Sequence, residues 1–356
     1  MRKREAKQRA QEWLSQKAGE LPGLKGAYLS GSFLERAEEA EWPQSSDLDL
    51  VLVFETGKSP GKIGKFKEHG VLLEATCIEE TEFTSPERVL ATHYLAYAMN
   101  AGEILLDSGG FLRKIHRETA AHYAEARWVN TRCRGFLERI RMGVEGFDPS
   151  APFPQQVNAW LFPTGIACFP ILSAALENCT VRKRYPAARR VLERYGMAEI
   201  YPRLLELLVP RPLCRETLFR HLEELERTFR LACASQGKSA SYAFRSDISP
   251  AGEAAAIGGS RELLLTPHPE DAVFWMAATF ARCHLILLMD GSPAYETRLP
   301  AFRAFLAELG IRQPEDFLRR GRGLLAFLPE LERAAGEIMA RREGEASPAY
   351  LRSKSD

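Results

Sequence analysis

The sequence lacks closely spaced cysteines, a charge excess of one sign and an apolar leader. Its seven cysteines are scattered and none forms a Cys-x-x-Cys pair, so neither a zinc site nor a disulfide framework is expected. We therefore predict a reducing, cytoplasmic location. The formal net charge of +1 disfavours bulk electrostatic binding to nucleic acid or to an anionic membrane.

An apolar segment directly after the N-terminus is also missing. The basic start Met1–Arg4 is followed by Glu, Lys, Gln and Arg instead of an apolar stretch, which argues against a secretory signal. The most apolar window, Ala272–Met289, contains Arg282 and His284, so we predict a buried helix there and no membrane partner. The 356 residues, of ordinary composition, favour a soluble protein of two domains.

What the sequence does contain is a run of predicted strands interrupted by polar residues. Leu24–Ser30 is predicted to be the first strand, and it ends in a Gly31-Ser32 turn followed by a short helix from Phe33. Asp47–Phe54 is predicted to be the second strand, because five consecutive apolar residues follow its second aspartate. This order places polar side chains where each strand begins or ends.

Three carboxylates are expected to meet on these strands. Asp47 and Asp49 face the same side of their strand, about 7 Å apart, where they repel each other unless a cation lies between them. Val71–Ile78 is predicted to be a further strand, and Glu74 is costly inside it unless paired or bound to metal. Because Mg²⁺ prefers oxygen ligands, we predict a magnesium site at Asp47, Asp49 and Glu74.

The Gly31-Ser32 turn is predicted to bind phosphate. Glycine lets the backbone approach a ligand closely, and N–H groups at the start of a helix favour phosphate. The Ser32 hydroxyl adds a further donor. A metal site and a phosphate site side by side are typical of enzymes that act on nucleoside triphosphates.

This combination of Gly-Ser, Asp-x-Asp on a strand and an acidic residue on a later strand resembles the DNA polymerase beta-type nucleotidyltransferase superfamily. The closest similarity is to its minimal, aminoglycoside-nucleotidyltransferase-like branch, which has a helical C-terminal half. The motifs cover roughly residues 24–78, with a weaker similarity over Ala91–Arg117. The spacer between Ser32 and Asp47 is longer than the pattern of the superfamily. The positions that match its metal-binding and triphosphate-binding residues are Asp47, Asp49 and Glu74, and Gly31 and Ser32, respectively.

The resemblance implies transfer of a nucleoside monophosphate from an NTP to a hydroxyl group, with release of pyrophosphate. Two Mg²⁺ ions are expected, with Mn²⁺ as a substitute, and Glu74 doubles as general base. A small-molecule acceptor such as an aminoglycoside or a related sugar fits the chain. Three alternatives stay open: adenylylation of a protein partner, RNA 3′-end extension, which the near-neutral charge disfavours, and a catalytically silent nucleotide-binding protein. The oligomeric state and the preferred NTP are not predicted.

Two cations are further candidates for nucleotide binding. Arg36 lies four residues after Ser32, one helical turn on, and is a candidate phosphate ligand. Lys183 lies in the basic run Thr180–Tyr185, from which one residue would reach the triphosphate; the alternative is that this run faces water. Asp107 is predicted to cap a turn.

The expected fold class is α+β. We predict a nucleotidyltransferase domain over residues 1–110, built from a mixed β-sheet with flanking helices, an all-α domain over 111–345, and a frayed tail over 346–356. Lys62–Lys67 is predicted to be a short edge strand protected by its lysines. Phe111–Val144 and Gln155–Asn178 are each predicted to be one helix, the second with kinks at its prolines.

Overall fold

The computed structural model describes residues 1–345, so the predicted tail at 346–356 lies outside the described residues. The chain forms two compact units. The first combines Met1–Tyr123 with Arg215–Phe302, and the second combines Ala124–Cys214 with the chain from Arg303 onward. This division differs from the predicted domains, because Arg215–Phe302, from the second half of the chain, falls in the same unit as the N-terminal sheet.

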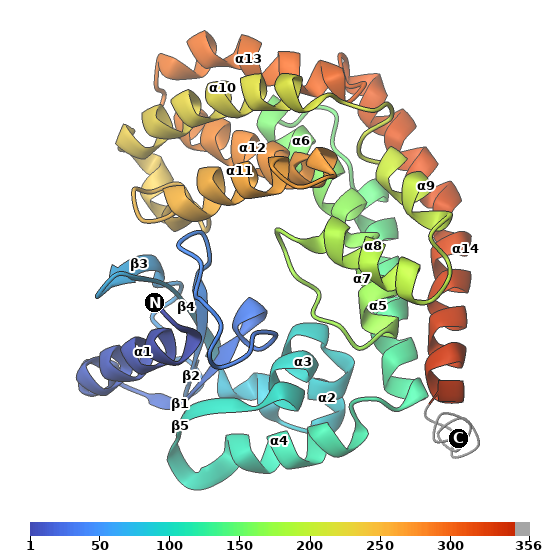
Figure 1. The fold of residues 1–356 in the computed structure, drawn as a ribbon. Helices are drawn as coiled ribbons and strands as arrows, with labels where there is room; N and C mark the ends of the chain where they lie inside the picture. The colour runs from blue at the N-terminus through green and yellow to red at the C-terminus, as the bar shows by residue number, and fades with distance from the viewer. Residues whose placement is uncertain (346–356) are drawn as a thin grey trace. The chain divides into compact units, whose positions relative to one another are not determined.

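The first unit contains a five-stranded mixed sheet in the order β3-β4-β2-β1-β5. Strands β2 and β4 are parallel, and the other neighbouring pairs are antiparallel. Within the described residues all strands precede residue 108 and the remainder is mostly helical, which confirms the α+β class (Figure 1). The strands are β1 (Leu24–Ser30), β2 (Leu48–Phe54), β3 (Gly64–Glu68), β4 (Val71–Glu79) and β5 (Glu103–Asp107).

Helices cover both faces of this sheet because alternate strand residues are apolar on each side. Helix α1 (Lys3–Lys17) packs Trp13 and Leu14 against one face, which includes Leu50 of β2. The opposite face, which includes Val53, is covered by three helices. These are α2 (Pro86–Ala91), α3 (His93–Ala101) and α4 (Phe111–His122).

The rest of the first unit is a helical layer in which α10 packs against α11 and α12 (Figure 1). The segment between α10 and α11 is largely irregular, with short 3₁₀ turns at Lys238–Ser241 and Arg245–Asp247. Helix α12 is buried from Val273 to Leu287, including its Arg and His. The helices are α10 (Arg215–Ala234), α11 (Gly259–Leu264), α12 (Val273–Met289) and the larger part of α13 (Ala294–Glu308).

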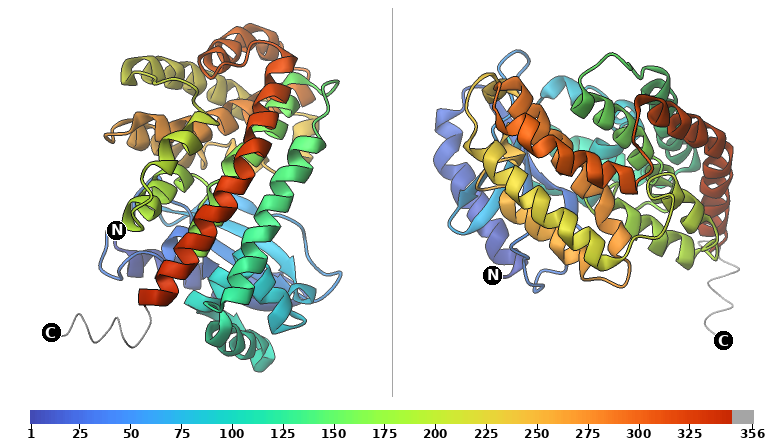
Figure 2. Two further views of the ribbon diagram at one scale, coloured as in Figure 1. Left: turned by 90° about the vertical axis from the view of Figure 1, so that its right-hand side faces the viewer. Right: turned by 90° about the horizontal axis from the view of Figure 1, so that it is seen from above.

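The second unit is helical throughout its described residues. Its two longest helices, α5 and α14, run side by side (Figure 2). The single helix predicted over Phe111–Val144 is wrong, because the chain breaks at 123–125 and forms α4 and α5; likewise Gln155–Asn178 forms α6 and α7. The helices are α5 (Ala126–Glu145), α6 (Phe153–Ile166), α7 (Phe169–Ala174), α8 (Arg184–Arg194), α9 (Ile200–Glu206) and α14 (Pro314–Glu345).

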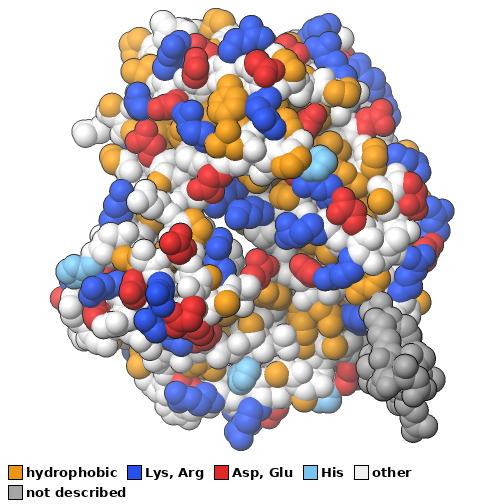
Figure 3. Space-filling view, viewed as in Figure 1, with side chains coloured by type: hydrophobic (Ala, Val, Ile, Leu, Met, Phe, Trp, Pro, Cys, Tyr) orange, Lys and Arg blue, Asp and Glu red, His pale blue; other side chains and the backbone are white. Residues whose placement is uncertain are grey.

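Two helical windows, Phe153–Ala174 and Pro269–Met289, are long and apolar enough to cross a membrane. They are 78% and 89% buried inside the protein, as core helices of soluble proteins also are, so they are weak evidence for membrane spans. Lys and Arg side chains mix with Asp and Glu over the face shown in Figure 3. That mixture agrees with the net charge of +1.

Candidate metal centre

The central strands bring the three predicted carboxylates together. Asp49 of β2 stands opposite Glu74 of the parallel strand β4, and Asp47 lies directly before β2. Because paired residues on neighbouring strands face the same side, all three carboxylates lie on the face opposite α1. Each offers an oxygen, and these oxygens lie within 4.8 Å of one another. The predicted convergence of these carboxylates is confirmed, and the group could hold a metal ion.

Burial and the neighbouring negative charges shift the pKa of one member of this group, Asp49. Burial raises the pKa of the Asp49 carboxyl well above its ordinary value, and the carboxylates of Asp47 and Glu74 raise it further. Two lysines, Lys65 and Lys62, oppose that shift. A divalent cation would relieve the same repulsion, and three carboxylate oxygens form a donor set that suits Mg²⁺.

Gly31 lies in contact distance of this group. Its φ of +65° is in the left-handed region, and a Cβ atom at this position would lie 1.8 Å from Asp49 Oδ2. Only glycine therefore fits here without moving the Asp49 carboxylate. Ser32 follows in the 3₁₀ turn Gly31–Phe33, so the Gly-Ser pair does lie beside the carboxylates.

The helix predicted from Phe33 is wrong, and this changes the setting of Arg36. After the 3₁₀ turn the chain continues in turns and loop as far as β2. The Arg36 guanidinium instead lies over the Trp42 ring, 5.7 Å from its centroid. Its Nε atom is buried and makes no hydrogen bond within the described part of the chain. A role for Arg36 in phosphate binding stays a prediction.

The other two predicted polar residues lie elsewhere. Lys183 directly precedes α8 in the second unit, so its role in nucleotide binding stays a prediction. Asp107 accepts hydrogen bonds from the backbone N–H groups of Leu112 and Arg113, both at 3.0 Å. The predicted capping role of Asp107 is confirmed, and the cap stabilises the start of α4.

Lys65 belongs to the same group of side chains, which the sequence did not indicate. It was expected to face solvent and protect the edge strand β3 from pairing with another chain, but its side chain is only 5% exposed and hydrogen-bonds the carboxylates of Asp47 and Glu74. Burial alone would lower the pKa of Lys65, but the surrounding carboxylates outweigh it and raise this pKa above its ordinary value. Lys62 Nζ lies 3.0 Å from Glu74 Oε1.

Two residues from the helical layer extend this ionic network. Asp247 Oδ1 lies 3.6 Å from Lys65 Nζ, and its other oxygen is 3.1 Å from Arg282 Nη1. The Arg282 guanidinium also lies over the rings of Phe244 and Trp275, 4.3 and 5.2 Å from their centroids. In the sequence, the only indication of a role for Arg282 was its charge inside the most apolar window. Nothing in the sequence indicated a role for Asp247.

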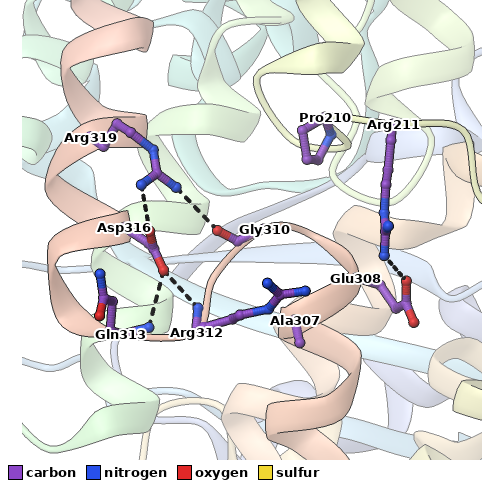
Figure 4. A pocket seen from close by; sticks show the side chains of 9 residues that line it. All are labelled: Pro210, Arg211, Ala307, Glu308, Gly310, Arg312, Gln313, Asp316 and Arg319. Carbon is purple, nitrogen blue, oxygen red and sulfur yellow. Dashed lines mark hydrogen bonds and ion pairs between the residues drawn. The ribbon is translucent and has the colours of Figure 1, made fainter.

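A hollow in the second unit is a poor functional candidate because its charged groups bind one another (Figure 4). Arg211 pairs with Glu308 at 2.6 Å, and Arg319 pairs with Asp316 at 2.6 Å. Asp316 also accepts two backbone hydrogen bonds at the start of α14. These contacts give Arg211, Glu308, Arg319 and Asp316 a role in stabilising the fold.

No model of a known protein family matches the chain, and a search of curated proteins finds no match either. The functional argument therefore rests on the residues themselves.

Proposed function

We propose that the protein is a metal-dependent nucleotidyltransferase of the DNA polymerase beta type. It would move a nucleoside monophosphate from an NTP to a hydroxyl of a small-molecule acceptor and release pyrophosphate. The observation that carries the proposal is the convergence of the Asp47, Asp49 and Glu74 carboxylates within 4.8 Å. That arrangement is costly for folding alone, and Gly31 lies against it at a point where a Cβ atom would be 1.8 Å from Asp49 Oδ2.

The three carboxylates would hold Mg²⁺, with two ions or Mn²⁺ as part of the proposal. When bound, the metal would neutralise phosphate charge and make the acceptor hydroxyl more acidic. Glu74, with 17% of its side chain exposed, would accept the proton that the acceptor hydroxyl loses. Gly31 and Ser32 would hold the triphosphate through backbone N–H groups and the serine hydroxyl.

A small sugar-like acceptor follows from the resemblance and from the near-neutral charge of the chain, which disfavours bulk electrostatic binding of RNA. The cytoplasm is the compartment that fits this substrate. One observation favours a second candidate, a catalytically silent nucleotide-binding protein: Lys65 and Lys62 pair with the carboxylates of Asp47 and Glu74 that would hold the metal.

Incubation with labelled ATP, GTP, CTP and UTP distinguishes the two candidates. The purified protein should transfer label to at least one member of an acceptor panel of aminoglycosides and related sugars, only when Mg²⁺ or Mn²⁺ is present. Mass spectrometry of the product should show the added nucleoside monophosphate. Binding of the metal and an NTP without labelling of any small molecule, protein or RNA would favour the silent protein.

A further inference from the structure

Lys65 occupies the side of the acidic group where a metal ion would bind. It lies on β3 directly opposite Glu74 of β4, and its ammonium hydrogen-bonds both Glu74 and Asp47. The strand cannot easily move away, because Gly64 packs tightly on Ser246, and a Cβ atom at Gly64 would lie 2.6 Å from the Ser246 Cβ. Lysine is rarely buried unless paired, so this contact is a built feature of the site.

The ionic network is close to neutral without a metal. Its carboxylates are Asp47, Asp49, Glu74 and Asp247, and its cations are Lys62, Lys65 and Arg282, which leaves a single negative charge. A divalent ion entering alone would therefore make the network positive and would have to displace the lysine. A triphosphate entering with the ion would reverse that excess, because it brings several negative charges of its own.

Asp247 provides a second acceptor for the displaced ammonium. Its Oδ1 atom lies 3.6 Å from Lys65 Nζ, and its other carboxylate oxygen pairs with the buried Arg282. The flexible stem of a lysine allows its ammonium to change partners over so short a distance. Lys65 can thus release Asp47 and Glu74 without becoming a buried charge that lacks a partner.

We propose that Lys65 is a built-in counterion that competes with the divalent metal for Asp47 and Glu74, so that metal binds tightly only together with the triphosphate. The proposal rests on the proposed function and makes Lys65 a positioning residue of that site. Under this proposal, the lysine contacts in the ligand-free protein are compatible with metal binding once the triphosphate is present. A purely structural ion pair would stabilise the fold without changing metal affinity.

The test is Mn²⁺ binding in the absence of nucleotide, measured from the electron paramagnetic resonance signal of free Mn²⁺. Lys65→Met should bind Mn²⁺ more tightly than the wild type, by on the order of tenfold, because the ion no longer has to break charge-assisted hydrogen bonds. Lys67→Met is the matched control, since this exposed lysine lies two residues further on the same strand. It should bind Mn²⁺ like the wild type.

A second measurement adds an ATP analogue with a methylene group between its α- and β-phosphorus atoms, which cannot be transferred. The advantage of Lys65→Met should then shrink, because the triphosphate favours metal binding in both proteins. Asp247→Asn should bind Mn²⁺ less tightly than the wild type, since it removes the negative charge of the second partner of Lys65.

The outcomes separate this inference from the proposed function. If Asp49→Asn abolishes Mn²⁺ binding but Lys65→Met binds no more tightly than the wild type, the competition is refuted and the metal site stands. If neither wild type nor Lys65→Met binds Mn²⁺ even with the analogue, both proposals fail. Should Lys65→Met not fold, Lys65→Gln keeps a polar contact without the charge and is expected to show the same direction of change.

Discussion

Asp49 has strand neighbours on both sides, Ser30 on β1 and Glu74 on β4, so its carboxylate cannot turn away from the acidic group. Asp49→Asn keeps the shape of the side chain and removes one negative charge. We expect nucleotide transfer to fall by orders of magnitude while the protein still folds. Without metal, the variant should be at least as stable as the wild type, because repulsion among the carboxylates is reduced.

Transfer rates and thermal unfolding in EDTA check this expectation. Glu41→Gln is the control, because it removes the same charge from an exposed position in the loop before β2. A variant Asp49→Asn that transfers nucleotide at the wild-type rate would refute the metal-dependent mechanism.

Gly31 allows a prediction with a closely matched control. Gly31→Ala forces a side chain into the left-handed region and into the Asp49 carboxylate, whereas Gly57→Ala, at φ +75°, meets open space. The backbone strain should cost about 1–2 kcal/mol of unfolding free energy in both variants. Only Gly31→Ala should lose more unfolding free energy than this, and only Gly31→Ala should bind Mn²⁺ more weakly than the wild type. Equal unfolding free energies and equal Mn²⁺ affinities in the two variants would contradict the close approach of Gly31 to Asp49.

His284 should make the stability of the first unit depend on pH. It is fully buried on α12, with Nδ1 3.0 Å from the Phe280 carbonyl oxygen, and burial lowers its pKa from 6.5 to about 4. The unfolded chain binds the proton more readily, so the contribution is complete above pH 6.5 and is lost as the pH falls toward 4. Between pH 7 and pH 5 the loss should be about 2 kcal/mol.

Urea unfolding of wild type and His284→Leu at these two pH values isolates this contribution, because other groups titrate equally in both proteins. The wild type should lose more stability than the variant on acidification. Identical losses would mean that His284 is accessible to protons in the folded state.

At the scale of elements, periodicity predicted the strands well and the helix ends poorly. The alternation of apolar residues is set locally, so β1 was predicted with the bounds that the structure has, and β2 and β4 within one residue. The break between α4 and α5 has no such local signal, because no Gly or Pro lies between residues 112 and 134. It falls at the boundary between the two units, where tertiary packing decides the path of the chain.

Some residues of the candidate site could be predicted from the sequence and others could not. Asp47, Asp49 and Glu74 were predictable because a carboxylate inside an apolar strand is costly without a partner. Lys65 was not, since an exposed lysine and a buried one on an edge strand leave the same pattern in the sequence. Asp247 lies 182 residues further along the chain in an irregular segment, and no periodicity links it to β3.

The start of α14 supplies a prediction for a single element. Asp316, in the first turn, accepts hydrogen bonds from the backbone N–H groups of Arg312 and Gln313 at 2.8 and 3.1 Å. These bonds outweigh burial and hold the pKa of Asp316 below its ordinary value. Asp316→Ala should therefore cost about 1–3 kcal/mol of unfolding free energy.

A substitution of the neighbouring Glu315 distinguishes the contribution of the hydrogen bonds from that of the negative charge. Glu315→Ala removes an exposed carboxylate from the same helix turn and should cost well under 1 kcal/mol. Urea unfolding of the two variants makes the comparison. Comparable losses would show that charge at the helix end, and not the hydrogen bonds of Asp316, stabilises this turn.

At the scale of the whole molecule, the chain passes between the two units three times, after Tyr123, Cys214 and Phe302. Residues 111–345 were predicted as helices joined by irregular segments with no strand, and this pattern does not indicate that Arg215–Phe302 belongs to the unit of the sheet. The return matters for the site, because it brings Asp247 and Arg282 to Lys65. A ligand at the acidic group should therefore stabilise two segments that are distant in sequence.

Hydrogen exchange measured by mass spectrometry tests this link. Mg²⁺ with the non-transferable ATP analogue should slow amide exchange in β2 and β4 and also around Arg245–Asp247, because binding to the folded state raises the free energy of opening of the unit that holds the ligand. Exchange in α5 and α8, which belong to the second unit, should change little. Asp49→Asn should lose both effects. Protection confined to residues before Tyr123 would mean that the returning helices open independently of the sheet, and that Asp247 does not act on the metal site in solution.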